Sequence, residues 1–356
     1  MTKQRLMRAS RVAALAAALF GLLVAAAAGP SPSRATARLA TPRTLYKQNG
    51  TIHNFAQDGG LMTWVAGPHY VVHLRGVSGG PGWVLGNAGP GAAVGARSAS
   101  TLVLGGKQAV WVKYAGVLTR EAGIYTAKPG AKRPTLIDAP GAGDFGGTYL
   151  TGLAAADERT IAYGTANVTY SSGSYSITGG GVHRIVGTKA YPHRLRNVVP
   201  PFAIATSAGR IAVVPAVLPD EYSSVVGAAP NGRVDVFDLS GNRLATVVPK
   251  GTVREVALSW PDLAVIMTRA DGTTAIDRFD AARGEFISNT PTPGATNLTI
   301  GTGGIVFLVG KSIYTLHDGQ AALLWRAAKK PIGLSIEGRR VAWAACGRIK
   351  ALTLPR

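Results

Sequence analysis

The sequence predicts an all-β protein built from seven copies of one strand pattern, and three observations support this fold class. An apolar triplet, often ending in an aromatic residue, recurs along the chain. Gly is abundant, with 46 copies in 356 residues, and short apolar runs are separated by the turn formers Gly, Asp, Asn and Pro. Outside the N-terminal region, no segment of ten or more residues has the 3.6-residue apolar period of a helix.

Each triplet is apolar at consecutive positions, as expected for a strand buried on both faces. Their third residues are 36 to 52 positions apart, close to the roughly 40–50 residues of a four-stranded propeller blade. The triplets are Met62-Thr63-Trp64, Ala109-Val110-Trp111, Ile161-Ala162-Tyr163, Ile211-Ala212-Val213, Leu263-Ala264-Val265, Ile305-Val306-Phe307 and Val341-Ala342-Trp343.

The surroundings of each triplet complete the repeat. A short apolar strand and a Gly- or Asp-containing turn precede it, and a more polar, alternating strand follows it. A weaker fourth strand can be recognised in five units, at residues 83–85, 135–137, 244–248, 286–287 and 323–325. Four antiparallel strands repeated seven times predict a single β-propeller. Six blades is the alternative if the short last two units are misread.

The two ends of the repeat region predict how the ring closes. The last unit has only three strands before the chain ends after Leu354, and Thr44–Lys47 precedes the first unit as a strand without a partner. We expect this N-terminal strand to complete the last blade, because closure removes the exposed edges of an open array.

The turn and triplet of the repeat are similar to those of known propeller families. A polar turn with Asp or Gly, followed by an apolar triplet ending in an aromatic residue, is clearest in Gln57–Trp64. This pattern resembles the TolB-like and WD40-like propeller repeats, and nearly all of the chain after residue 43 follows it. The resemblance implies the architecture and, as is usual in such families, a binding role.

The N-terminus predicts export. Lys3, Arg5, Arg8 and Arg11 precede an uncharged, Ala- and Leu-rich run over residues 12–28, and Ala26-Ala27-Ala28 offers small residues for cleavage. We expect a signal peptide over residues 1–28, a flexible leader over 29–43 and the propeller over 44–356. The alternative is an uncleaved anchor, although the run is shorter than the about 20 residues of a membrane span. The composition and signal look bacterial, so we expect a secreted or cell-envelope location.

The chain is strongly basic, with a net charge of +20. This charge favours anionic partners such as acidic wall polymers, and the alternative is that it only keeps the protein soluble. We expect no specific nucleic-acid binding, because aromatic residues do not alternate with the basic ones. The densest basic group is Arg326, Lys329, Lys330, Arg339, Arg340, Arg348 and Lys350.

Several short motifs are better explained as structure than as chemistry. Ser78 lies in a Gly-x-Ser-x-Gly string but is followed by another strand rather than a helix. The Gly-rich residues 141–146 precede a strand, so they lack the helix that a dinucleotide loop needs. His69 and His73 would lie about 13 Å apart on a strand. We therefore assign no catalytic residue, metal or cofactor, and we expect Cys346, the single cysteine, to be buried.

The candidate binding site lies in two long connections between second and third strands. Residues 164–181 contain Tyr170 and Tyr175, and residues 215–232 contain Asp220, Glu221 and Tyr222. Equivalent connections of successive blades lie on one face of a ring, so we expect the two to be neighbours, and long loops on a rigid scaffold often carry function. The alternative is a neutral insertion.

The sequence therefore favours a monomeric, non-enzymatic binding scaffold. Its partner would be an extracellular or cell-envelope protein, glycan or other anionic polymer, bound through one face of the ring. The main alternative is an extracellular hydrolase or lyase acting on carbohydrate or lactone at the central channel, and a third hypothesis is an assembly factor of the TolB kind. A channel lined by three or more His, Asp or Glu residues would favour the enzyme.

Overall fold

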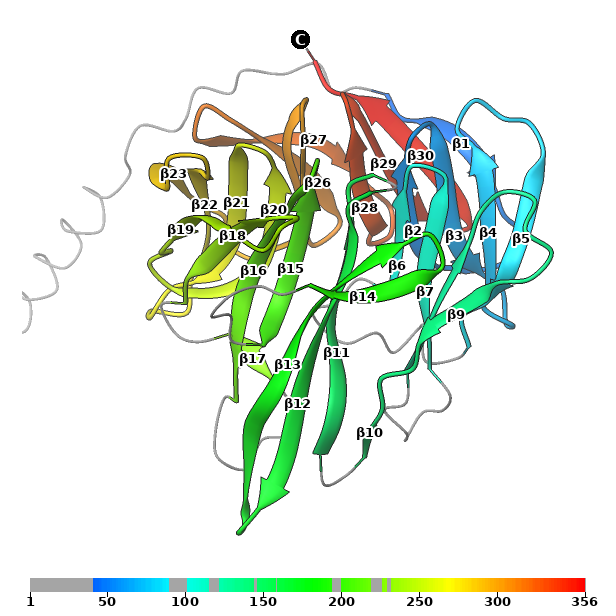
Figure 1. Ribbon diagram of the computed structural model, residues 1–356. Coiled ribbons are helices and arrows are strands. Elements are labelled where there is room, and N and C mark those ends of the chain that lie inside the picture. Colours follow the sequence, from blue (N-terminus) through cyan, green and yellow to red (C-terminus); the bar gives the residue numbers. More distant parts are fainter. Residues whose placement is uncertain are drawn as a thin grey trace, which may run out of the picture. The chain divides into compact units, whose positions relative to one another are not determined.

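The computed structural model describes residues 41–89, 101–114, 122–143, 146–157, 159–193, 200–218, 226–228 and 232–355. Their strands form seven antiparallel sheets arranged as the blades of a β-propeller (Figure 1), which confirms the predicted fold class. No helix occurs among these residues, so the described part of the chain contains no helix that could cross a membrane.

Every blade follows the strand order predicted from the repeat. The innermost strands are β2 (Ile52–Asp58), β6 (Leu102–Gly105), β11 (Gly146–Ala155), β15 (Pro201–Ser207), β20 (Thr252–Ser259), β24 (Ala295–Gly301) and β28 (Ile332–Glu337). The seven triplets all lie in second strands, which are β3 (Leu61–Ala66), β7 (Gln108–Tyr114), β12 (Ile161–Ser171), β16 (Arg210–Val217), β21 (Asp262–Thr268), β25 (Gly304–Val309) and β29 (Arg340–Ala345).

The third and fourth strands complete the sheets. The third strands are β4 (Val71–Gly76), β8 (Ala122–Ala127), β13 (Ser174–Val186), β18 (Val234–Asp238), β22 (Thr274–Asp280), β26 (Ser312–His317) and β30 (Arg348–Thr353). The outermost are β5 (Gly82–Asn87), β9 (Thr135–Asp138), β14 (Lys189–His193), β19 (Arg243–Val247), β23 (Glu285–Pro291), β27 (Gln320–Arg326) and β1 (Arg43–Lys47). Two short additions are β10 (Ala142–Gly143) on β11 and β17 (Gly227–Ala228) on β16.

The ring closes as the sequence predicts. β1 pairs antiparallel with β30, so that Arg43 lies opposite Ala351 and Lys47 opposite Arg348. The Tyr46 ring packs on Trp64 with centroids 4.8 Å apart, and the Trp64 indole N–H donates to Gln48 Oε1 at 3.1 Å. The N-terminal strand thus belongs to the seventh sheet and also contacts the first.

The third residue of each triplet lies directly opposite a residue of the third strand, and in four blades the two rings pack together. The pairs, with centroid distances, are Trp64–His73 at 5.2 Å, Trp111–Tyr125 at 6.2 Å, Tyr163–His183 at 4.7 Å and Phe307–Tyr314 at 5.6 Å. Aromatic pairs of this kind stabilise a sheet beyond the burial of their area. The recurrence shows why an aromatic ends most triplets.

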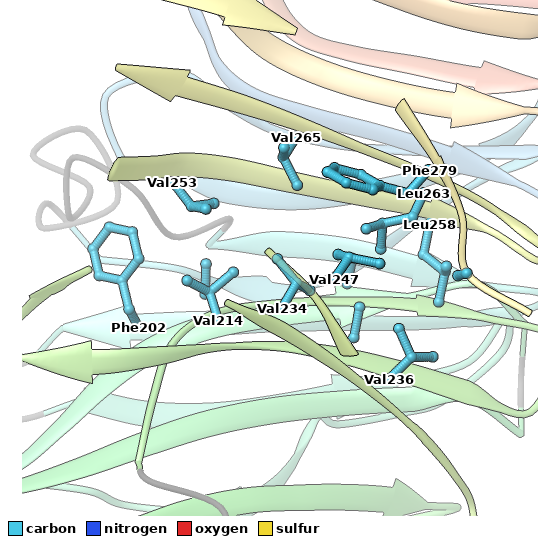
Figure 2. Close-up of a cluster of buried hydrophobic side chains, with 14 of the residues drawn as sticks. Phe202, Val214, Val234, Val236, Val247, Val253, Leu258, Leu263, Val265 and Phe279 are labelled. Atoms are coloured by element: carbon cyan, nitrogen blue, oxygen red, sulfur yellow. The ribbon is translucent and has the colours of Figure 1, made fainter. Parts of the chain in front are cut away.

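The core consists of apolar layers between neighbouring blades. Figure 2 shows the largest, where Val214, Val234 and Val236 of the fourth blade face Leu263 and Val265 of the fifth. Each of these five side chains is almost inaccessible to solvent. Fully burying one such side chain contributes about 1.5–3 kcal/mol, so the layers account for a stable ring without any disulfide.

The two faces of the ring differ in their connections. We call the face that carries the connections between second and third strands, and those between blades, the hairpin face. The opposite, turn face carries the tight turns, which are linked from blade to blade by hydrogen bonds. Asp58 accepts from the Gly106 N–H at 2.5 Å, Thr160 from Gly209 at 3.0 Å, Ser207 from Trp260 at 3.0 Å and Glu337 from Gly60 at 3.0 Å.

Two expectations from the sequence are wrong. Residues 164–181 are not a loop, because β12 continues to Ser171 and β13 begins at Ser174, so only a two-residue turn remains. Cys346 is exposed rather than buried, because it forms the β29–β30 turn with Gly347 and both residues have positive φ, 51° and 66°. Such a turn directs its side chain away from the sheet. The sequence pattern also missed β14, the fourth strand of the third blade.

Candidate functional site

The β12–β13 hairpin is the most prominent feature of the hairpin face and projects beyond the other blades (Figure 1). Two predicted site residues lie near its tip. Tyr170 and Tyr175 are directly opposite each other, and their ring centroids are 4.9 Å apart with a tilt of 52°. Tyr170 is 45% exposed, although a large side chain would normally be buried. The pair therefore presents an aromatic surface at an exposed tip.

Glycines at irregular positions shape this hairpin. Gly180 has a φ of 124°, and a Cβ there would lie 2.3 Å from the carbonyl oxygen of Thr165. Gly146 is similar, since its Cβ would lie 2.2 Å from the oxygen of Val168. The register of β12 and β13 shifts between Asn167 and Val168. Only glycine allows the backbones to approach so closely, so these residues hold the extension in its path.

The base of the hairpin is fixed by a polar and aromatic network. The Tyr163 hydroxyl donates to Asp138 Oδ2 at 2.5 Å, and Thr165 Oγ1 lies 3.2 Å from His183 Nε2. Burial lowers the pKa of His183, against an opposing effect of the Asp138 carboxylate, and burial also raises the pKa of Tyr163. Ring pairs occur at the equivalent position of three other blades, which indicates that the Tyr163–His183 pair serves packing rather than catalysis.

The hairpin also contacts the fourth blade. Ile177 of β13 packs against the apolar cluster that includes Phe202, and Val226 and Ala228 pack against the same cluster. Residues of the hairpin and of the β16–β18 connection thus pack against one apolar cluster. The other predicted site residues, Asp220, Glu221 and Tyr222, lie outside the described residues.

A central channel runs along the seven innermost strands and has a volume of about 480 Å³. Its wall is mainly Gly, Ala, Leu, Val and Ile. Several polar side chains in the wall are hydrogen-bonded to a neighbouring blade. Asn54 donates to Thr101 Oγ1 at 2.7 Å, and Gln57 donates to the oxygens of Ser335 and Arg340 at 3.1 Å. These groups join blades and are not directed at a common point.

Glu255 is the one Asp, Glu or His among the described residues that line the channel. Its carboxylate accepts the N–H groups of Asn297 at 3.0 Å and Leu298 at 2.7 Å. Burial raises its pKa, while those two hydrogen bonds and the charge of Lys330 act in the opposite direction. A single engaged carboxylate does not provide the acid and base pair of a glycoside hydrolase.

The remaining sequence motifs form no chemical site where they are described. Ser78 lies in the turn between β4 and β5, so the strand-to-helix geometry of a nucleophile elbow is absent there. His73 stacks on Trp64 within β4, whereas His69 lies in the preceding turn. In the described part of the chain, no three His, Cys, Asp or Glu side chains lie close enough to hold a metal ion.

No protein-family model and no curated protein sequence matches this chain. Among solved structures it is similar to virginiamycin B lyase from Staphylococcus aureus, at 14% identity and a TM-score of 0.54, over 88% of this chain and 99% of that one. It is also similar to the Cps50 (Swd1) β-propeller domain of Myceliophteria thermophila, at 10% identity and a TM-score of 0.52, over 88% and 100%. The β-propeller domain of the Trilobed protease from Pyrococcus furiosus matches at 9% identity and a TM-score of 0.51, over 85% and 94%. At these identities the likeness shows the β-propeller fold, and the TolB-like relationship stays a prediction.

Proposed function

We propose that this chain is an extracytoplasmic β-propeller that binds an extracellular or cell-envelope partner, a protein or a polysaccharide, through the hairpin face. The observation that carries the proposal is the Tyr170–Tyr175 pair at the tip of the projecting hairpin. Tyr provides a large contact area and a polar hydroxyl at a low entropic cost, and an extended hairpin on a rigid ring keeps it in place. Export rests on the basic, apolar and small-residue segments of residues 1–28.

The channel supports binding over catalysis. Hydrolysis or elimination needs positioned acids and bases, and the described channel wall offers Glu255 alone, with both oxygens engaged. The solved lyase among the similar structures shares the fold, and at 14% identity this likeness carries no activity over to the present chain. The hydrolase or lyase hypothesis therefore has no support from a specific group of residues in the described part of the channel wall.

The test compares partner capture by three versions of the chain. The immobilised protein is exposed to culture medium and solubilised envelope of the producing cells, and the retained proteins and sugars are identified. We expect Y170A/Y175A to lose a partner that the unchanged chain retains, with an unaltered melting temperature. Tyr191→Ala is the control, because Tyr191 is 50% exposed on the same blade but lies on β14, away from the tip. Retention of the same partner by both variants would disprove the hairpin as the contact.

A further inference from the structure

Basic residues gather on the hairpin face of the last three blades, on the opposite side of the ring's circumference from the second blade. Every residue that connects strands there is described by the structure. Nine cations lie in these connections or at the adjoining strand ends: Lys47, Lys250, Arg254, Arg269, Lys311, Arg326, Lys329, Lys330 and Arg348. Asp271 is the one acidic residue in the connections themselves, and its carboxylate accepts hydrogen bonds from the Thr273 N–H and hydroxyl. Glu255 follows Arg254 on β20, and its carboxylate accepts N–H groups of the sixth blade.

The cations are neighbours through the pairing of their strands. Lys47 lies directly opposite Arg348 on β1 and β30. Arg326 pairs with Ser312, and the carbonyl of Lys311 accepts the Ala327 N–H at 2.9 Å. On the fifth blade, the Arg254 guanidinium donates to Thr268 Oγ1 at 3.0 Å, beside Arg269. Each of the three consecutive blades thus carries cations at its hairpin-face end.

The close ion pairs of these blades lie away from this basic patch, although Glu255 feels the charge of Lys330, and Asp277 the charges of Lys250 and Arg269. In these three blades, the ion pairs among described residues lie on the turn face: Arg278–Asp262, Arg283–Asp280, Arg283–Glu285, His317–Asp318 and Arg340–Glu337. None of the nine cations of the hairpin face forms an ion pair with a described carboxylate. A charge that served only solubility would not require this separation, because cations spread over both faces would do the same.

The arrangement opposes stability. Like charges directly opposite on neighbouring strands, such as Lys47 and Arg348, repel each other. Positive charges held together on one surface instead attract a polyanion and raise its rate of encounter. A patch of this kind suits a ligand with repeated negative charges better than it suits folding.

We propose that this patch binds an acidic polysaccharide, a chain whose carboxylate or phosphate groups recur along its length. The connections that carry it contain no aromatic residue on which bases would stack, and Val248 is their one large apolar side chain that is mostly exposed. Single-stranded nucleic acid and insertion into a membrane interface are therefore disfavoured. The proposal rests on the proposed function only for the extracytoplasmic location, and it uses a different part of the hairpin face from the Tyr170–Tyr175 pair.

The experiment measures binding of polygalacturonate, with neutral dextran and phosphatidylglycerol vesicles as comparison ligands. The patch variant replaces Lys311, Arg326, Lys329 and Arg348 by Gln. The control variant replaces Lys132, Arg133, Arg159 and Lys189 by Gln, which removes the same two Lys and two Arg from exposed positions of the turn face. Both variants have the same net charge, so only the place of the charge differs.

We expect the unchanged chain to bind polygalacturonate with an affinity that falls as salt rises, and the patch variant to lose at least about tenfold in affinity. The control variant should stay within about twofold. Equal losses in the two variants would show that net charge alone is responsible and would overturn the proposal. Binding to vesicles but not to polygalacturonate would also overturn it, in favour of a lipid surface. Y170A/Y175A should bind polygalacturonate normally, so failure here is distinguishable from failure of the proposed function.

Discussion

The carboxylate of Glu255, on the innermost strand of the fifth blade, accepts the backbone N–H of Leu298 on the sixth blade at 2.7 Å. The other oxygen accepts the N–H of Asn297, whose φ is 54°. The register of β24 and β25 shifts between Thr296 and Thr299, so these N–H groups belong to a β-bulge without regular ladder partners. Glu255 therefore supplies acceptors that the irregular strand needs, and this explains why a carboxylate occurs in an apolar channel.

Replacing Glu255 by Ala should destabilise the ring. The substitution leaves the N–H groups of Asn297 and Leu298 without their acceptor at the channel wall, which costs about 1–3 kcal/mol. Chemical denaturation of the variant and the unchanged chain measures the loss. Lys250→Ala, at an exposed position on the same blade, should stay within about 0.5 kcal/mol. An E255A variant as stable as the unchanged chain would contradict this structural role.

The pH dependence of stability should reveal the same carboxylate. Burial raises the pKa of Glu255 above its ordinary value of 4.5, so the folded protein binds this proton more tightly than the unfolded chain does. In the window between the two pKa values, the contribution of Glu255 to stability therefore falls as pH rises, and it is most favourable below 4.5. Melting curves of the unchanged chain and E255Q from acidic to neutral pH test this. We expect the stability of the unchanged chain relative to E255Q to decrease with rising pH, and parallel curves would show that the pKa is not raised.

The sequence predicted the architecture well because the repeat has a direct physical cause. The third residue of each triplet packs between two blades, as Trp64 and Trp343 do, so an apolar or aromatic side chain is needed there in every unit. The pairing of β1 with β30 was predictable for a similar reason, since an incomplete last blade leaves an edge that the N-terminal strand can cover.

The hairpin and the patch could not be read from the sequence to the same degree. Residues 164–181 are rich in Ser, Thr and Gly, a composition typical of loops, and their strand structure depends on glycine bulges such as Gly180. The cations of the patch are scattered along the chain, from Lys47 to Arg348, and only the closure of the ring brings these two side by side. Cys346 was misplaced because the pattern does not show where a buried strand gives way to a turn.

Gly180→Ala should disturb the projecting hairpin. Its φ of 124° is unfavourable for a residue with a side chain, and the added Cβ would meet the backbone of Thr165 and Ala166. We expect a loss of about 1–3 kcal/mol, visible in a thermal melt or as faster amide exchange in β12 and β13. Gly181→Ala is the matched control, because a Cβ there has open space and φ is not positive. If both substitutions had the same effect, the positive φ and close backbone contact of Gly180 would not be what makes alanine unfavourable there.

Cys346 should react in the folded protein. Its side chain is exposed in the β29–β30 turn, so a thiol reagent such as dithionitrobenzoate has access without unfolding. We expect one thiol per chain to be titrated at the same level in native buffer and in denaturant. A C346S variant should show no labelling, and protection of the thiol in native buffer would instead support the buried position expected from the sequence.

Deleting residues 44–48 tests the closure of the ring. The deletion removes the pairing of β1 with β30, the Tyr46 ring that packs on Trp64, and the Gln48 acceptor of the Trp64 indole. The edge of β30 would lose its partner strand and become open, so we expect the chain to lose at least about 2 kcal/mol of stability and to aggregate more readily. The control replaces Arg43 and Lys47 by Ala, which removes two exposed side chains but keeps the backbone hydrogen bonds. Because this control leaves the strand in place, its melting temperature should stay close to that of the unchanged chain. A deletion variant that melts at the same temperature as this control would mean that β1 does not hold the ring together.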